Sequence, residues 1–306
     1  MLAVTICQLF YGIPSLSLML FFFLLPMFER KTLSNPFYRL LQIDLFVNIT
    51  CYLNTWIALR LSQEDLGYEF LKVLEHWAPG ILTISSFMCR VYFHLQNFTG
   101  IFLALYRFTS INCLNTDHYW RRFYLLIPVL GVAYCLFILS PWWMSGNFIV
   151  RIVIINGEMF RKTQAKAMFV LSSVDCFFAI FYFLLVLLLG VWTTRVAMNR
   201  YNKHHSQRFS NFIKKMTRIV YCNSFLMSGN LLFLVFLEFL LMIRSIRDTV
   251  REHQTTVVTF TSDLFTLAMP YILLLFDSNI RRKLGIERPE KSDLYSTKTA
   301  NYSPRN

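Results

Sequence analysis

Seven apolar segments, each long enough to cross a lipid bilayer as a helix, constrain this chain more than any other feature. An α-helix rises about 1.5 Å per residue, so about 20 apolar residues span the hydrocarbon core. The segments cover residues 6–28, 37–61, 79–111, 123–144, 168–192, 219–243 and 257–276. The sequence therefore predicts an all-α membrane protein, a seven-transmembrane helix bundle in one domain over residues 1–284, followed by a disordered cytoplasmic tail over 285–306.

The composition disfavours a soluble enzyme. Of the 306 residues, 56% are hydrophobic and 17% aromatic, a larger apolar share than soluble domains carry. We find no HExxH motif, no phosphate-binding glycine loop and no nucleophile elbow, so we expect no catalytic residue and no cofactor. The seven cysteines form no CxxC pair, which argues against a metal site. Basic residues border the apolar segments, so nucleic-acid binding is not expected either.

The third apolar segment, residues 79–111, carries polar side chains where a spanning helix is usually apolar. Arg90, His94 and Asn97 stand at i, i+4 and i+7 and therefore share one helical face. Polar groups at membrane depth are costly unless they face protein or a wet cavity. The spacing predicts a central helix with neighbours on most sides, ending with Arg107 at the water boundary.

Basic residues gather on one side of the seven segments, and this asymmetry predicts the orientation. With the N-terminus outside, twenty Lys and Arg fall in inner segments and nine in outer ones, with Arg90 set aside as intramembrane. Because basic loops stay in the cytoplasm, we expect the N-terminus outside and the C-terminus in the cytoplasm. The four basic residues of the outer loop 145–167 count against this orientation. The basic inner loops also suit anionic membrane lipid.

Three carboxylates lie at a similar depth near the outer ends of the last three segments, between about five and seven residues from the end. A small-molecule site between helices needs a largely apolar wall and a few polar groups that fix orientation. The candidate ligand-binding residues are Trp56, Arg90, His94, Asn97, Asp175, Glu238 and Asp263. The alternative is structural, because Arg90 could pair with one carboxylate and hold the bundle together.

A second polar pair lies in the inner half of the second segment. Asp44 and Asn48 stand at i and i+4, so they share a helical face. We expect a buried polar link from this pair to the seventh segment in preference to a ligand site.

The inner side of the bundle carries a candidate coupling surface for a cytosolic transducer. Residues 193–218 hold seven basic residues and no acidic one, and apolar residues at i, i+3, i+4 and i+7 from Phe209 predict that the sixth helix continues into the cytosol. The candidate coupling residues are Arg107, Arg208, Lys214, Lys215 and Arg218. Anchoring to the membrane surface is the alternative use of such a helix.

Three connecting segments carry predictions of their own. Residues 62–78 hold four acidic residues and are predicted to form an outer loop. The longest outer loop, 145–167, has an alternating Ile and Val run before Asn156-Gly157, which favours a β-hairpin. After the seventh segment, Ile280 and Leu284 at i and i+4 predict a short helix.

Several short motifs, taken in order, resemble the nematode chemoreceptors of serpentine receptor class gamma, the Srg family. They are YGIPSL at 11–16, YRLLQID at 38–44, YLNTW at 52–56, LYRFTS at 105–110, SDLFT at 262–266 and PYIL at 270–273. The resemblance extends to about residue 284. It implies a receptor with a G-protein-coupled-receptor-like fold in the plasma membrane of chemosensory neurons, which binds a small-molecule ligand and couples to a heterotrimeric G protein.

The resemblance also marks departures from rhodopsin-like receptors. Arg107 stands where those receptors have the arginine of an Asp/Glu-Arg-Tyr motif, but Tyr106 precedes it, so no adjacent acid can hold the arginine. The outer loop 145–167 contains no cysteine, so Cys89 is expected to stay outside any disulfide. An inverted seven-span ligand-gated channel, a transporter and a scaffold without a ligand remain as alternative functions.

Overall fold

The structure is a computed structural model of the chain. It describes the backbone of residues 2–29, 35–113, 116–144, 150–155, 158–163, 165–203, 207–242 and 247–286. Within 141–172, 200–217 and 241–254 the description is of the backbone alone. The predicted disordered tail lies outside the described residues from position 287 onward.

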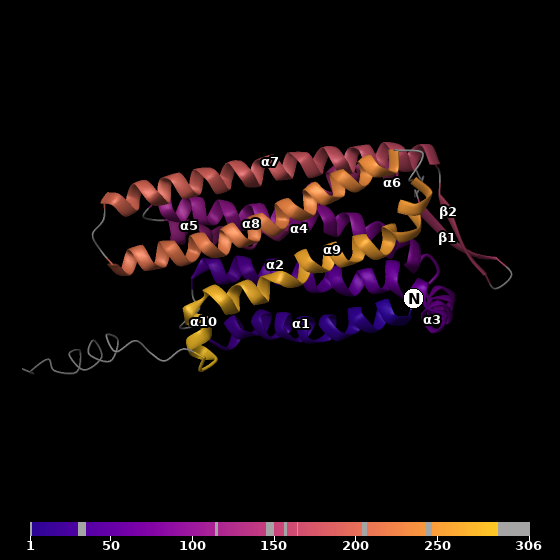
Figure 1. Cartoon of the computed structure of the whole chain (residues 1–306), viewed down its shortest axis with the longest axis horizontal. Helices are drawn as coiled ribbons and strands as arrows, with labels where there is room; N and C mark the ends of the chain where they lie inside the picture. Colours follow the sequence, from indigo (N-terminus) through magenta and orange to yellow (C-terminus); the bar gives the residue numbers. More distant parts are fainter. Residues whose placement is uncertain are drawn as a thin grey trace, which may run out of the picture.

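Within the described ranges, seven long helices run side by side along one axis (Figure 1). They are α1 (Leu2–Phe28), α2 (Pro36–Thr55), α4 (Ile81–Asn112), α6 (Leu126–Met144), α7 (Ala165–Lys203), α8 (Gln207–Met242) and α9 (Arg247–Phe276). These helices coincide with the seven apolar segments, so the predicted seven-helix bundle is confirmed.

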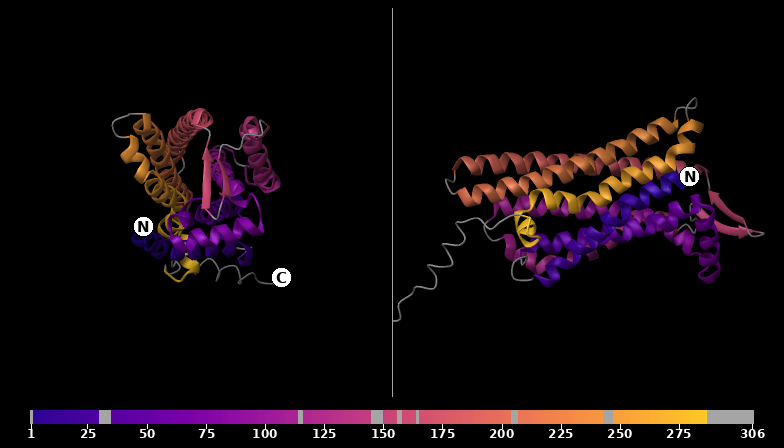
Figure 2. Two further views of the ribbon diagram at one scale, coloured as in Figure 1. Left: turned by 90° about the vertical axis from the view of Figure 1, so that its right-hand side faces the viewer. Right: turned by 60° about the horizontal axis from the view of Figure 1, so that its bottom comes forward.

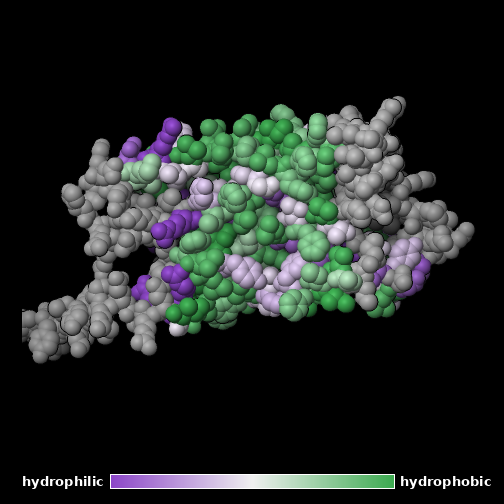
Figure 3. Space-filling model, viewed as in Figure 1, coloured by the Kyte–Doolittle hydropathy of each residue, from purple (hydrophilic) through white to green (hydrophobic). Residues whose placement is uncertain are grey.

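The two ends of the bundle differ. The N-terminus, α3 (Asp65–Trp77) and a β-hairpin lie at one end, which we call the N-terminal end (Figure 2). The short helix α10 (Ser278–Lys283) lies at the opposite end, which we call the tail end. A band of apolar side chains covers the face of the bundle between these two ends (Figure 3). Such a band is what a bilayer core requires of a spanning protein.

Helix α4 is the centre of the bundle, as its polar face predicted. It packs against α2, α6, α7 and α8, while α1 closes the ring between α2 and α9. The side chains of His94, Gln96 and Asn97 are buried within the bundle. Buried polar groups therefore face neighbouring helices and leave the apolar residues for lipid.

Hydropathy alone identifies fewer spans than the packing does. Among the described residues, three helices are long and apolar enough to cross a membrane by composition: Ala3–Phe28, Ser173–Asn199 and Thr255–Phe276. A fourth results if Thr116–Phe123 and Leu126–Ser140, which meet at 61°, count as one span. Helices α2 and α4 carry charged and amide side chains such as Asp44 and Asn97, which lower their mean hydropathy but lie in the interior.

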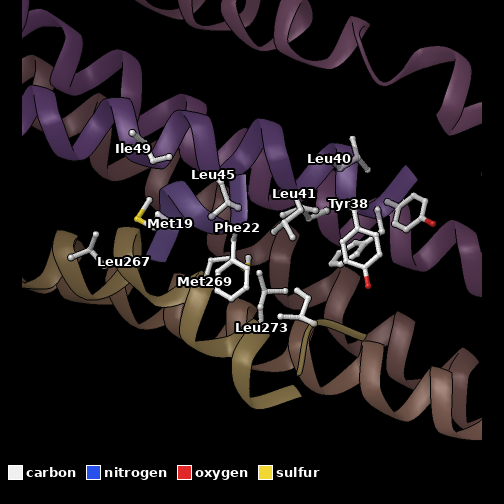
Figure 4. Packing of buried hydrophobic residues seen from close by; sticks show 14 of the residues in the cluster. Met19, Phe22, Tyr38, Leu40, Leu41, Leu45, Ile49, Leu267, Met269 and Leu273 are labelled. Carbon is white, nitrogen blue, oxygen red and sulfur yellow. The ribbon is translucent and has the colours of Figure 1, made fainter. Parts of the chain in front are cut away.

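A hydrophobic cluster fills the space where α1, α2 and α9 meet (Figure 4). Its members include Met19 and Phe22 from α1, Leu41 and Leu45 from α2, and Leu267 and Leu273 from α9. Because lipid tails are as apolar as these side chains, close packing and not water exclusion holds the helices together in a membrane. Gly12 shows how close the packing is, since a Cβ there would lie 1.9 Å from the hydroxyl oxygen of Tyr52.

Local sequence sets several helix ends. Helix α2 begins with Asn35 as its N-cap, whose side chain accepts a hydrogen bond from the Phe37 amide at 2.8 Å, and with a proline as its first residue. Helix α10 ends at Lys283 and is followed by Gly285, whose φ of 70° suits glycine. The start of α4 is capped from outside the helix by the carboxylate of Glu75, which accepts from the amides of Gly80 and Leu82.

The prediction of an outer loop over residues 62–78 is wrong. After α2 the chain continues through a π-helix, η1 (Trp56–Arg60), and a 3-10 turn, η2 (Leu61–Gln63), into the 13-residue helix α3. The link before the fourth span is likewise helical, as α5 (Thr116–Phe123). The charged residues of both segments favoured a prediction of loops, although their apolar residues recur with the period of a helix.

The predicted hairpin, the N-terminal extension of the sixth helix and the short helix after the seventh segment (α10) are confirmed. Strands β1 (Val150–Ile155) and β2 (Glu158–Thr163), which flank Asn156 and Gly157 in sequence, pair antiparallel with Ile155 opposite Glu158. Helix α8 begins at Gln207, so the sixth span continues as one helix through the basic segment. Helices α7 and α8 project past the others at the tail end (Figure 1).

Candidate functional site

Two groups of polar side chains lie in the half of the bundle nearer the N-terminal end, and the first joins α4 to α7. Arg90 Nε lies 3.7 Å from Asp175 Oδ2, and His94 Nε2 lies 4.0 Å from Asp175 Oδ1. The Arg90 and Asp175 side chains are 24% and 30% exposed, whereas His94 is fully buried. We call this group, together with Tyr134 and Tyr182, the α4–α7 cluster.

Tyrosine hydroxyls and aromatic rings complete the α4–α7 cluster. His94 Nδ1 and the Tyr182 hydroxyl are 2.8 Å apart, and the Tyr182 and Tyr134 hydroxyls are 2.7 Å apart. The rings of Phe93 and Phe178 lie 5.1 and 5.3 Å from the His94 ring, both edge to face. Buried His94 Nε2 has no hydrogen-bond partner within the described structure, so the cluster has spare capacity for a polar group.

The second group is enclosed in the bundle, although the buried Nε and Nη1 of Arg60 have no hydrogen-bond partner within the described structure. Asp263 on α9 accepts hydrogen bonds from Arg60 and from the Tyr11 hydroxyl. The guanidinium of Arg60 also lies over the rings of Tyr52 and Trp56, at 4.8 and 5.0 Å from their centroids. Arg60 and Asp263 are 2% and 3% exposed. We call this group the Arg60–Asp263 cluster.

The candidate ligand-binding residues were predicted to lie together near the outer ends, but the structure divides them between two groups. Asp263 and Trp56 belong with Arg60, while Asp175 and His94 belong with Arg90. The difference arises because Arg60, the last residue of the π-helix, is buried and pairs with Asp263. In the count of Lys and Arg that predicts the orientation, Arg60 is one of the nine residues assigned to the outer side.

Two further candidates give different results. The side-chain amide of Asn97 is buried and donates to the backbone oxygen of Phe93 in the preceding turn, at 2.6 Å. Glu238 lies on the backbone of α8, but its side chain is outside the described residues. The sulfur of Cys89 accepts a hydrogen bond from the side-chain amide of Asn54 at 3.3 Å, and no disulfide joins it to another cysteine among the described residues.

The buried polar link expected at Asp44 and Asn48 is confirmed. Gln96 on α4 donates to Asn48 on α2 at 2.7 Å and to Thr266 on α9 at 3.0 Å. The Thr99 hydroxyl donates to Asp44 at 2.7 Å. This network joins three helices in the middle of the bundle, between the polar groups at its two ends.

Polar contacts at the tail end surround Arg107. This residue is 4% exposed, not at the water boundary as predicted, and its guanidinium lies 4.8 Å from the ring centre of Phe37. The Tyr38 hydroxyl donates to the fully buried carboxylate of Asp277 at 2.9 Å, and this carboxylate lies within electrostatic range of Arg107. An acid from the α9–α10 junction thus stands near the arginine that lacks an acidic neighbour in sequence.

The remaining coupling candidates lie on the projecting part of α8. Arg218 is exposed on this helix. The side chains of Arg208, Lys214 and Lys215 fall outside the described residues, although the helix that carries them is described.

Sequence reasoning missed several residues that the structure places in polar clusters, among them Arg60, Tyr182 and Asp277. Arg60 follows Tyr52 and Trp56 at intervals of four, a spacing that indicates a shared face. Tyr182 and Asp277 gave no comparable signal, because a tyrosine in an apolar run and an acid at a segment end are ordinary in membrane helices. Their roles depend on contacts between distant segments.

A bundle of seven apolar helices with polar clusters enclosed at both ends defines a multi-pass membrane protein of the receptor type. Comparison with protein families identifies the family, because the model of the Srg family chemoreceptors matches residues 5–284. The chain belongs to the Srg family. Membership in a family of chemoreceptors favours a receptor over an enzyme.

Two relatives from Caenorhabditis elegans support this assignment. Serpentine receptor class gamma-47 is 29% identical over 279 residues, which cover 91% of this chain and 89% of the relative. Serpentine receptor class gamma-53 is 26% identical over 287 residues, which cover 92% and 90% of the two chains. The similarity therefore extends over the whole bundle.

Proposed function

We propose that this protein is a plasma-membrane chemosensory receptor that binds an external small-molecule cue at the α4–α7 cluster and signals to a cytosolic heterotrimeric G protein. The observation that carries the proposal is the contrast between the two ion pairs. Arg90 and Asp175 are partly exposed and loosely joined at 3.7 Å, whereas Arg60 and Asp263 are enclosed. A ligand needs polar groups that it can reach, and only the Arg90–Asp175 pair is partly exposed.

The chemistry of the α4–α7 cluster defines the kind of cue. A cation and a carboxylate side by side favour a ligand that carries a polar or charged group, and the rings of Phe93 and Phe178 favour an apolar or aromatic body. The cue competes with the loose ion pair, so its binding energy includes the separation of Arg90 from Asp175. The same arrangement favours a small ligand, because α6 and α7 both pack on α4 and the Tyr134 and Tyr182 hydroxyls meet at 2.7 Å.

Signalling follows if the cue binds one arrangement of the helices better than another. Helix α4 carries Arg90 and His94 at one end and Arg107 at the other, with Gln96 and Thr99 between them. A shift of α4 therefore changes the contacts of Arg107 with Phe37 and with the charge of Asp277. The tail-end surface offered to the transducer by α8 changes with it.

The test is a cue screen in cultured cells that carry the receptor and a G-protein activation sensor. For any compound that activates the wild type, Asp175→Asn and Arg90→Gln should raise the half-maximal concentration by about tenfold or more, equivalent to about 1.4 kcal/mol. Surface expression is measured in parallel with an epitope tag.

Glu69→Gln serves as the matched control. Glu69 pairs with Lys72 at 2.8 Å at the same end of the molecule, but it is exposed and remote from the α4–α7 cluster. This variant should keep the wild-type response. A compound that activates the Asp175→Asn and Arg90→Gln variants with unchanged potency would contradict the proposed site.

A further inference from the structure

Helix α3 carries an apolar stripe that no part of the described chain covers. Leu66, Phe70, Val73 and Trp77 follow one another at intervals of four, three and four residues, so they fall within about 60° of the helix circumference. These side chains are 87%, 55%, 55% and 82% exposed. We call them the α3 stripe. Large apolar side chains gathered on one exposed face indicate an interaction surface.

The opposite side of α3 fixes the helix on the bundle. Leu71 is buried, and Gly67 packs so closely that an added Cβ would lie 2.3 Å from the backbone oxygen of Leu61. Glu75 joins the end of α3 to the start of α4 through the amides of Gly80 and Leu82. The orientation of the stripe is therefore set by the fold.

The helix lies across the end of the bundle, perpendicular to the long helices (Figures 1 and 2). If those helices cross a bilayer, α3 lies parallel to the membrane plane. The apolar lipid-facing surface reaches this level on both flanking helices, through Leu53 on α2 and Ile84 on α4, which are about half exposed. The α3 stripe continues that surface.

We propose that α3 is an interfacial helix whose stripe inserts into the lipid headgroup region beside the N-terminal end of the bundle. Leucine, phenylalanine and tryptophan on one face, with charged residues on the other, are typical of helices that lie in the membrane interface. Trp77 stands at the end of the stripe, and tryptophan prefers the boundary between lipid and water. Lipid is favoured over a protein partner because α3 lies across the end of an apolar bundle, which is where the membrane interface falls if the long helices span a bilayer.

The test places an environment-sensitive fluorophore on α3 in the full chain, reconstituted in phosphatidylcholine vesicles. The parent carries Cys7→Ser and Cys113→Ser, since those two cysteines are exposed, and its residual labelling is subtracted. Phe70→Cys and Val73→Cys place the label on the stripe. His76→Cys is the matched control, because His76 is exposed on the same helix but about 90° away from the stripe.

Labels on the stripe should be quenched by spin-labelled phosphatidylcholine, and iodide in the water should quench them roughly threefold or more weakly than the label at position 76. Equal iodide quenching at all three positions would overturn the proposal, because the stripe would then face water. Shielding from iodide without quenching by spin-labelled lipid would also overturn it, since protein would then cover the stripe.

A second measurement needs no cysteine substitution. The fluorescence of the wild type minus that of Trp77→Phe reports Trp77 alone. Phosphatidylcholine brominated near the headgroup should quench this difference signal more than lipid brominated near the chain end. A difference signal that neither lipid quenches would overturn the proposal independently.

Discussion

Two arginines near the N-terminal end of the bundle show how surroundings decide the role of a charge. Arg60 is enclosed by Asp263 and by the rings of Tyr52 and Trp56. Arg90 faces Asp175 in a partly exposed pair. Enclosed charges are expensive to separate, whereas partly solvated ones are not. The first pair therefore stabilises the bundle, and the second is suited to exchange its partner for a ligand.

Removal of one partner from the enclosed pair should be severe. We expect Asp263→Leu to lower the free energy of unfolding by about 3–5 kcal/mol, because Arg60 is then left as an uncompensated buried charge. The double variant Arg60→Met with Asp263→Leu should recover most of this loss. Thermal unfolding in detergent and surface expression measure both effects. Asp175→Asn, the control in the open pair, should cost about 1 kcal/mol or less, and an Asp263→Leu variant as stable as this control would contradict the interpretation.

Sequence alone located the charges but not all of their partners. The depth of Asp175 and Asp263 along their helices was predictable from residue counts, since each residue advances a helix by about 1.5 Å. Their separation into two clusters depends on the π-helix that ends at Arg60 and on which helices adjoin α4. The spacing of Tyr52, Trp56 and Arg60 indicates a shared face, but which helix lies opposite that face is not encoded locally. The link from Asn48 through Gln96 to Thr266 was partly foreseen because polar residues in two spans must find partners.

At the level of elements, the predictions succeed where one physical requirement dominates. The seven spans follow from the need for long apolar runs, and the β1–β2 hairpin follows from alternating residues before an Asn-Gly turn. Helix α3 was predicted as a loop because of its acidic residues, although Leu66, Phe70, Val73 and Trp77 follow a helical spacing. The apolar periodicity of those four residues was visible and would have indicated an amphipathic helix.

The contact between α1 and α2 depends on the absence of a side chain at Gly12. A Cβ at this position would lie 1.9 Å from the Tyr52 hydroxyl oxygen and 3.0 Å from the ring carbon that carries it. We expect Gly12→Ala to destabilise the protein by about 1–3 kcal/mol, the usual effect of overpacking. Thermal unfolding in detergent is the measurement.

A control variant and a compensating variant test the interpretation of Gly12→Ala. Gly190→Ala on α7 is the matched control, because a Cβ there meets no atom within 4 Å. It should be neutral or slightly stabilising, since alanine favours the helix over glycine. Adding Tyr52→Phe to Gly12→Ala should restore part of the loss by removing the clashing oxygen. Equal stability of Gly12→Ala and Gly190→Ala would show that the two helices can separate without cost.

At the scale of the whole molecule, α4 joins the polar groups of both ends. It contributes Arg90 and His94 near the N-terminal end, Gln96 and Thr99 in the middle, and Arg107 at the tail end. A central helix with polar contacts along its length cannot move at one end without altering contacts at the other. Helix α4 therefore offers a route by which a change at one end of the bundle can alter contacts at the other, whichever side of the membrane each end occupies.

Orientation is the prediction on which the direction of signalling depends. The excess of Lys and Arg in the segments at the tail end predicts an external N-terminus and a cytoplasmic C-terminus. An epitope tag at the N-terminus should therefore bind antibody on intact cells, and a tag at the C-terminus only after permeabilisation. A C-terminal tag exposed on intact cells would invert the receptor, place Arg107 outside and favour the alternative of a ligand-gated channel.

Helix α7 has 39 residues and a length of about 58 Å, whereas the hydrocarbon core is about 30 Å thick. With α8 it projects beyond the rest of the bundle at the tail end (Figure 1). If the pair tilts about a pivot in the membrane, its projecting tips move further than the parts near the pivot. A tilt of about 5° at the pivot displaces a tip about 25 Å away by about 2 Å. A change too small to disturb the packing of the core thus becomes a displacement that a docked protein can detect.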